Sequence, residues 1–143
     1  MGTVLVCGPP GSGKTTYVKE RAKPGDLIVD FDAILSAISG QEWYRASADL
    51  KPYACEARDA IIFHLKRMLK PDAWIITSSS DPDYVRTLKK ATRATLVMLA
   101  VPANECLRRI AADTRRVDQL EGWRAVVNQW WVEYRSRPWD EAA

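Results

Sequence analysis

The sequence lacks any long hydrophobic run. No apolar stretch approaches the roughly 20 residues that are needed to cross a bilayer. The chain opens with Met1-Gly2-Thr3 and leads straight into a strand-like segment, without a basic leader or a cleavage pattern. We therefore expect a cytoplasmic protein with no membrane partner.

Cysteine is scarce, and neither sign of charge is in large excess. The three cysteines, Cys7, Cys55 and Cys106, are odd in number and lie among apolar residues, which favours free thiols over a disulfide framework or a zinc site. The formal net charge of +3 is too small to indicate a nucleic-acid partner by itself. Internal repeats, low-complexity stretches and linkers are also missing. At 143 residues, of which 47% are hydrophobic, the chain predicts a single domain over residues 1–143.

What the sequence does contain is an alternation of short apolar runs with segments of helical period. Near-continuous apolarity is typical of strands that are covered on both faces, and it occurs at residues 3–7, 27–29, 73–77 and 95–100. Helices are expected at residues 14–21, 33–39, 52–69, 81–91, 103–113 and 119–137, with a capping box at Ser80 opening the fourth of them. This order predicts an α/β fold, a doubly wound parallel sheet of four to five strands with helices on both faces.

A phosphate-binding motif follows the first predicted strand directly. The eight residues from Gly8 to Thr15 fit G-x-x-x-x-G-K-[ST] at every position, between a strand and a helix as the mechanism needs. Glycines at positions 11 and 13 allow backbone N–H groups to point at phosphate oxygens, Lys14 adds a positive charge for the β- and γ-phosphates, and Thr15 offers a hydroxyl to Mg²⁺. The motif predicts a P-loop NTPase fold that binds ATP and Mg²⁺. The expected nucleotide contacts are Gly8, Pro9, Pro10, Gly11, Ser12, Gly13, Lys14, Thr15 and Thr16.

Carboxylates end the second predicted strand. Asp30 and Asp32 fall at the carboxyl edge, where open α/β sheets bind their ligands. We expect Asp32 to accept the proton of an attacking hydroxyl, and the alternative is that Asp32 caps the following helix. The third strand ends in hydroxyl residues, and its first following carboxylate is Asp81. The predicted metal ligands are therefore Thr15, Asp30 and Asp81, although Asp81 equally fits the start of a helix.

Four arginines cluster after the fourth predicted strand, at Arg108, Arg109, Arg115 and Arg116. Phosphoryl transfer needs cations over the γ-phosphate in the transition state. We expect a mobile lid at about residues 108–118, with Lys14, Arg109 and Arg115 in catalysis and Arg116 on the nucleotide. A solvated helix face is the alternative.

Tryptophan is concentrated near the end of the chain, where Trp123, Trp130, Trp131 and Trp139 fall within 21 residues. Aromatic residues at helical spacing most often pack in a core. The alternative is that they stack on bases.

These residues together resemble the P-loop kinase branch that includes the kinase domain of polynucleotide 5′-kinases, with zeta-toxin-like and small-metabolite kinases as relatives. On this resemblance Asp32 corresponds to the catalytic Asp, and residues 101–109 lead into the arginine-bearing lid. Leu35 stands where polynucleotide kinases carry an Arg, and Ser78 stands where the family has an acidic residue. The opening GPPGSGKTTYV also resembles small phage-encoded P-loop proteins described as AAA-type ATPases.

The resulting prediction is a P-loop kinase that moves the γ-phosphate of ATP to a hydroxyl of a nucleic-acid 5′ end or of a nucleotide. A kinase for a small metabolite is the nearest alternative. From a different class, the chain could be an ATP-binding and ATP-hydrolysing accessory module that regulates a protein partner such as a nuclease or packaging enzyme.

Overall fold

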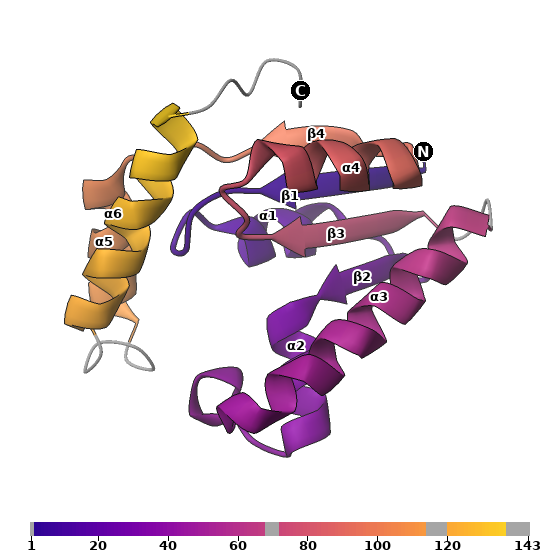
Figure 1. The fold of residues 1–143 in the computed structure, drawn as a ribbon, viewed down its shortest axis with the longest axis horizontal. Coiled ribbons are helices and arrows are strands. Elements are labelled where there is room, and N and C mark those ends of the chain that lie inside the picture. Colours follow the sequence, from indigo (N-terminus) through magenta and orange to yellow (C-terminus); the bar gives the residue numbers. More distant parts are fainter. Residues whose placement is uncertain (1, 68–71, 114–119, 137–143) are drawn as a thin grey trace.

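Four parallel strands form one sheet in the structure, a computed structural model that describes residues 2–67, 72–113 and 120–136. The strands are β1 (Thr3–Cys7), β2 (Leu27–Asp30), β3 (Ala73–Thr77) and β4 (Thr95–Met98), in the order β2-β3-β1-β4. Val6 in the central strand pairs with Ile76 of β3 and with Val97 of β4. Because every pairing is parallel, the carboxyl ends of the strands meet at one edge of the sheet (Figure 1).

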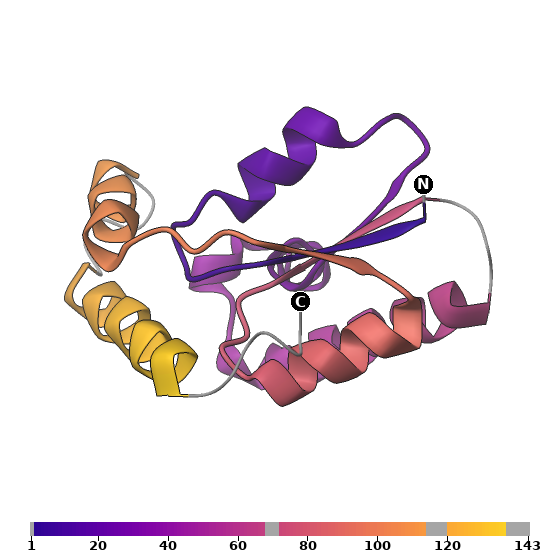
Figure 2. The same cartoon turned by 90° about the horizontal axis from the view of Figure 1, so that it is seen from above.

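Helices cover both faces of this sheet and extend beyond its carboxyl edge. The described elements are α1 (Lys14–Arg21), α2 (Phe31–Ser39), α3 (Lys51–Arg67), α4 (Pro82–Thr92), α5 (Ala103–Ala112), α6 (Leu120–Ser136) and the short 3-10 helices η1 (Trp43–Arg45) and η2 (Ala48–Leu50). Figure 2 shows α1 on one face, α3 and α4 on the other, and α5 beside α6 past the strand ends. No helix in the described ranges is long and apolar enough to span a membrane.

The core explains why the strand sequences are apolar throughout. Leu5 and Cys7 of β1 pack in a cluster with residues of α3 and α4, whereas Val6 packs with Val18 of α1 and with Ile76. Successive side chains of a strand point to opposite faces, and here each face meets a helix layer. The predicted α/β fold with a four-stranded parallel sheet is thus confirmed.

Element boundaries differ from the prediction at the fourth strand, which ends at Met98 instead of residue 100, and at two helix starts. The second helix begins two residues early, at Phe31, because Asp30 is its N-cap. The expected capping box at Ser80 is wrong: the N-cap of α4 is Asp81, whose side chain accepts a hydrogen bond from the backbone N–H of Asp83 at 2.9 Å. Pro82 then occupies the first helical position, where its fixed φ angle suits the helix and its missing N–H has no cost.

Candidate active site

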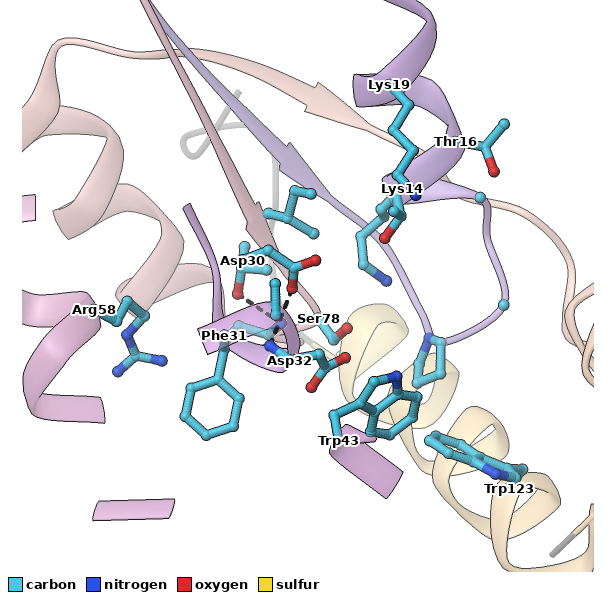
Figure 3. A pocket seen from close by; sticks show the side chains of 18 residues that line it. Lys14, Thr16, Lys19, Asp30, Phe31, Asp32, Trp43, Arg58, Ser78 and Trp123 are labelled. Carbon is cyan, nitrogen blue, oxygen red and sulfur yellow. Dashed lines mark hydrogen bonds between the residues drawn. The ribbon is translucent and has the colours of Figure 1, made fainter. Parts of the chain in front are cut away.

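A cleft of about 700 Å³ opens at the carboxyl edge of the sheet. Three parts of the chain form its walls: the phosphate loop with α1, the start of α2 with η1 and α3, and the end of β3 with α6. The lining residues are Pro10, Gly11, Gly13, Lys14, Thr15, Thr16, Lys19, Asp30, Phe31, Asp32, Ala33, Trp43, Arg58, Ile76, Thr77, Ser78, Ser79 and Trp123 (Figure 3).

The phosphate loop depends on two glycines with positive φ angles. Gly11 has φ +82°, and a Cβ atom there would lie 2.7 Å from the carbonyl oxygen of Cys106. Gly13 has φ +88° and forms the N-cap of α1, whose first turn contains no acidic residue and no side-chain cap. The backbone N–H groups at this helix start therefore remain for an anion, as expected for a site that holds the phosphates of ATP.

Lys14 lies inside the loop. Its side chain is buried, and its Nζ donates hydrogen bonds to the carbonyl oxygens of Gly8 and Pro9, both at 2.9 Å. Burial lowers the pKa of Lys14 to about 8, while the nearby Cys7 and Asp32 act in the opposite direction. The ammonium group is thus held at the bottom of the anion site, next to the acidic wall of the cleft.

The two aspartates after β2 have different surroundings. Asp30 accepts a hydrogen bond from the backbone N–H of Asp32 at 3.1 Å and so caps α2. The alternative in which Asp32 is the cap is therefore wrong. Asp32 lies in the first turn of α2 and lines the cleft together with Lys14 (Figure 3). The predicted base and the predicted phosphate-binding lysine thus face one cavity.

Strand β3 lies between β1 and β2, so its end separates the phosphate loop from the aspartates. Thr77 and Ser78 line the cleft at this point, and both are uncharged. In the ranges that the structure describes, no three His, Cys, Asp or Glu side chains gather where they could hold a metal ion. Any metal here would depend on one or two protein oxygens together with phosphate oxygens and water, which is the usual coordination of Mg²⁺ beside a nucleotide.

The three predicted metal ligands do not lie together. Thr15 and Asp30 line the cleft, on opposite sides of the end of β3. Asp81 caps α4 and is not part of the lining. Each oxygen donor in the cleft, the Thr15 hydroxyl or a carboxylate of Asp30 or Asp32, suits a hard cation such as Mg²⁺.

The arginine cluster contacts the phosphate loop from α5. Arg109 donates from Nη1 to the carbonyl oxygen of Ser12 at 3.1 Å, and its Nε lies 3.2 Å from Glu105. Arg108 pairs with the same carboxylate, and hydrogen bonds from both arginines lower the pKa of Glu105 to about 2. Residues 108–112 of the expected lid thus belong to a helix, and Arg115 and Arg116 lie outside the described residues.

The C-terminal tryptophans serve different purposes. Trp130 and Trp131 donate their indole N–H groups to the carbonyl oxygens of Ser78 and Val101, at 3.0 and 3.2 Å, which fastens α6 to the edge of the sheet. Trp123 packs with Trp131 against the buried cluster of Cys106, Ile110 and Val127, and it also lines the cleft. Trp139 lies outside the described residues.

Arg58 and Trp43 are among the lining residues that sequence reasoning missed. Arg58 lies on the face of α3 that also carries the buried Ala54 and Ile62, so a charge on an apolar stripe was the available signal. Trp43 belongs to a 3-10 turn between α2 and α3, in a segment without periodicity. Nothing local indicated that Trp43 would face the cleft.

Comparison with solved structures shows the same fold in several proteins. A chain of the Pnkp1/Rnl/Hen1 RNA repair complex matches 96% of this chain with a TM-score of 0.70 at 15% identity, and the present chain spans only 47% of that chain. Shikimate kinase from Acinetobacter baumannii, in complex with shikimate, matches 95% of this chain with a TM-score of 0.61 at 19% identity, over 79% of its own length. TT1252 from Thermus thermophilus matches 94% with a TM-score of 0.52 at 21% identity, over 84% of its length.

The sequence itself matches a family model. No curated protein matched the chain significantly. The family model described as an AAA domain (AAA_33) matches residues 4–131, which include the phosphate loop, both aspartates, Arg109 and Trp123. This protein therefore belongs to the AAA domain family AAA_33, a family of P-loop kinases.

Proposed function

We propose that this chain is an ATP-dependent kinase that transfers the γ-phosphate to a hydroxyl of a nucleic-acid 5′ end or of a nucleotide. One observation carries the proposal: Lys14 of the phosphate loop and Asp32 after β2 line the same cleft. The family and the shared fold support a kinase of some kind, and the nature of the acceptor is the proposed part.

The phosphate loop forms the donor side. The N–H groups at the start of α1 bind the phosphates of ATP, and Lys14 exchanges its bonds to the Gly8 and Pro9 carbonyls for phosphate oxygens. Thr15, with Asp30 or Asp32 on the other side of the cleft, would hold Mg²⁺, which would supply positive charge for the phosphate being transferred. Arg109 keeps the loop in this shape through the Ser12 carbonyl.

Asp32 acts at the acceptor side as a general base. An acceptor O–H loses its proton to the Asp32 carboxylate, its oxygen bonds to the γ-phosphorus, and the bond from that phosphorus to the β–γ bridging oxygen breaks. ADP leaves with the bond's electron pair. A positioned base contributes typically about 10²–10⁴-fold to such a reaction.

Charge at the far end of the cleft suits an anionic acceptor. Arg58 lines this end; its Nε pairs with the carboxylate of exposed Asp59 at 3.2 Å, and its guanidinium lies 5.6 Å from the centre of the Phe31 ring. A guanidinium binds phosphate through two parallel hydrogen bonds. Arg58 therefore offers a cation for the acceptor phosphate. Leu35, which stands where polynucleotide kinases carry an Arg, is uncharged and only 2% exposed, so it cannot take this role.

The second candidate is a kinase for a small anionic metabolite. The match to shikimate kinase favours it, because the match covers 79% of that enzyme but only 47% of the matched chain in the RNA repair complex. The same Asp32 and Arg58 would then meet the hydroxyl and the anionic group of one small molecule.

The deciding experiment supplies γ-labelled ATP and Mg²⁺ with a panel of acceptors: 5′-hydroxyl DNA and RNA oligonucleotides, nucleosides, nucleotides and hydroxylated carboxylic acids. Label on a 5′ end or a nucleotide supports the proposal, and label on a small acid supports the second candidate. Label found solely in free phosphate, with every acceptor, would overturn both.

A further inference from the structure

Two tryptophans from opposite walls meet in the cleft. The ring centroids of Trp43 and Trp123 lie 5.7 Å apart, with an angle of 76° between the ring planes (Figure 3). Trp43 belongs to η1, which follows α2, and Trp123 belongs to α6. Both side chains line the cleft that also contains Asp32.

Core packing does not account for Trp43. Its side chain is partly exposed, and it belongs to none of the three buried clusters found in the described residues. Its other ring contact is with the adjacent Tyr44, at 5.6 Å. A large aromatic side chain that is kept partly exposed inside a cleft is available to a ligand.

The other described tryptophans differ from Trp43. Trp74 donates its indole N–H to Asp26 at 3.1 Å, and Trp130 and Trp131 bond to backbone carbonyls. Trp74 and Trp130 are also buried. Hydrogen bonds and burial therefore explain where these three tryptophans lie, whereas Trp43 lies in the lining of the cleft.

We infer that Trp43 and Trp123 form an aromatic site for the flat ring of the acceptor's terminal base, so that the acceptor is a nucleoside-containing molecule. This inference rests on the proposed kinase function and specifies its substrate class. Two ring planes near a right angle form a corner, in which a base can stack on one ring while its edge meets the other. Stacking tolerates every base, so the site selects for a base without selecting which one.

The geometry favours the acceptor base over the adenine of ATP. The triphosphate occupies the phosphate loop, and the hydroxyl that attacks it must lie beside Asp32. Asp32 lies in the first turn of α2, which the strand order places across the end of β3 from the loop, and Trp43 lies in η1, the next element along the chain. A ring attached to the attacking sugar therefore reaches the tryptophan pair without crossing the donor phosphates.

The test compares a 5′-hydroxyl oligonucleotide that has an ordinary first residue with one whose first residue is abasic. Stacking of one base is worth about 1–3 kcal/mol, so the wild-type protein should prefer the ordinary acceptor by about 5-fold to 150-fold in kcat/KM. Trp43→Ala should remove most of this preference by raising KM for the ordinary acceptor, with KM for ATP unchanged. Trp43→Phe should keep part of the preference.

Tyr53→Ala is the matched control, because Tyr53 is an aromatic residue of α3 that is 65% exposed and does not line the cleft. Equal use of the two oligonucleotides by the wild-type protein would overturn the inference, even if Trp43→Ala failed to fold. So would a Trp43→Phe or Trp43→Ala variant whose defect lies in KM for ATP.

A binding measurement separates this inference from the kinase proposal. If no acceptor is phosphorylated, the affinities of the two oligonucleotides for the ADP-loaded protein are compared by fluorescence anisotropy. Tighter binding of the ordinary oligonucleotide that is lost in Trp43→Ala supports the aromatic site although the kinase proposal has failed. Equal binding overturns the aromatic site as well.

Discussion

Asp30 accepts a hydrogen bond from the backbone N–H of Asp32 at 3.1 Å, and this bond gives two similar residues different tasks. The carboxylate of Asp30 closes the start of α2, while the helix that it caps carries Asp32 into the cleft. Capping, which the sequence left as the alternative to catalysis for Asp32, thus falls on Asp30, and Asp32 stays the proposed general base.

Asp32→Asn should lower kcat for phosphoryl transfer by about 10²–10⁴-fold, because the amide cannot accept the proton of the acceptor hydroxyl. The Kd for ATP should stay nearly unchanged, since the phosphate loop is untouched. Single-turnover transfer and equilibrium nucleotide binding measure the two effects. Asp49→Asn, an exposed residue of η2, is the control. Undiminished transfer by the Asp32 variant would assign the base to another group.

Asp30→Ala should lower the free energy of unfolding by about 1 kcal/mol, because the N–H of Asp32 loses its cap. Asp30→Asn should cost much less, since asparagine caps helices about as well as aspartate. Urea denaturation of the two variants gives the comparison. An asparagine variant as unstable as the alanine variant would show that charge, rather than the capping bond, is what the helix start needs.

Arg109→Ala should raise KM for ATP about fivefold, which corresponds to a lost hydrogen bond of about 1 kcal/mol between α5 and the phosphate loop. The estimate is at the low end because the Arg109 side chain is 42% exposed. Arg108→Ala is a matched control: Arg108 shares the Glu105 partner and is 69% exposed. If both substitutions raised KM for ATP equally, the loss of positive charge near the phosphates, and not the contact of Arg109 with the loop, would explain the effect.

Gly11→Ala should destabilise the protein by about 1–3 kcal/mol and weaken ATP binding, because alanine is strained at φ +82°. Its Cβ would also approach the Cys106 carbonyl oxygen to 2.7 Å. Gly122→Ala provides the opposite case. Gly122 lies in α6 with no atom near its Cβ position, so alanine should raise stability by up to about 1 kcal/mol. Thermal unfolding with and without ATP checks both results.

The pH dependence of ATP binding should report the state of Lys14, whose pKa burial lowers to about 8. Below pH 8 the free protein already carries the charge. Above pH 8 the Lys14 amine of the free protein is mostly neutral, and the bound phosphates favour its protonated form, so ATP binding takes up a proton. The affinity for ATP therefore falls by at most about tenfold per pH unit. Calorimetry at pH 7 and pH 9, in buffers of different ionisation enthalpy, measures the uptake. Lys14→Met should abolish the difference between the two pH values.

The lowered pKa of Lys14 also affects the stability of the free protein, which rises with pH, whereas the affinity for ATP falls with pH. The pKa of Lys14 is lowered from 10.5 to about 8 on folding, so the unfolded chain binds more protons between these values. The contribution of this group to the free energy of unfolding therefore rises with pH across that interval. Lys14→Met removes that rise.

Local sequence signals predicted much of the fold. The strands at Thr3–Cys7 and Ala73–Thr77 and the helix Lys14–Arg21 have the expected bounds, because each is defined by a short apolar run or by the phosphate motif beside it. The strand order β2-β3-β1-β4 was not specified, since the apolar runs are too alike to indicate their neighbours. The cap at Asp81 in place of Ser80 is a difference of one residue between two equally common cap types.

The candidate site was predicted where the chemistry is local and missed where it depends on distant segments. Asp32 was found because the end of a strand in a parallel sheet reaches the ligand edge whatever the strand order is. Arg58 and Trp43 were missed because each faces the cleft only after α2 and α3 have packed on one another. The contact of Arg109 with Ser12, 97 residues away in the chain, likewise needs α5 to be in place.

The sequence by itself determined the presence of a phosphate-binding motif and with it the family of this chain, because the glycines and the lysine of that motif lie within eight consecutive residues. Tertiary structure alone decided what stands opposite that loop. Asp32, Arg58, Trp43 and Trp123 come from four different elements, and their meeting in one cleft results from the burial of apolar faces elsewhere in the molecule. Burial of those faces is not directional, so no local pattern records which polar or aromatic side chains it brings together.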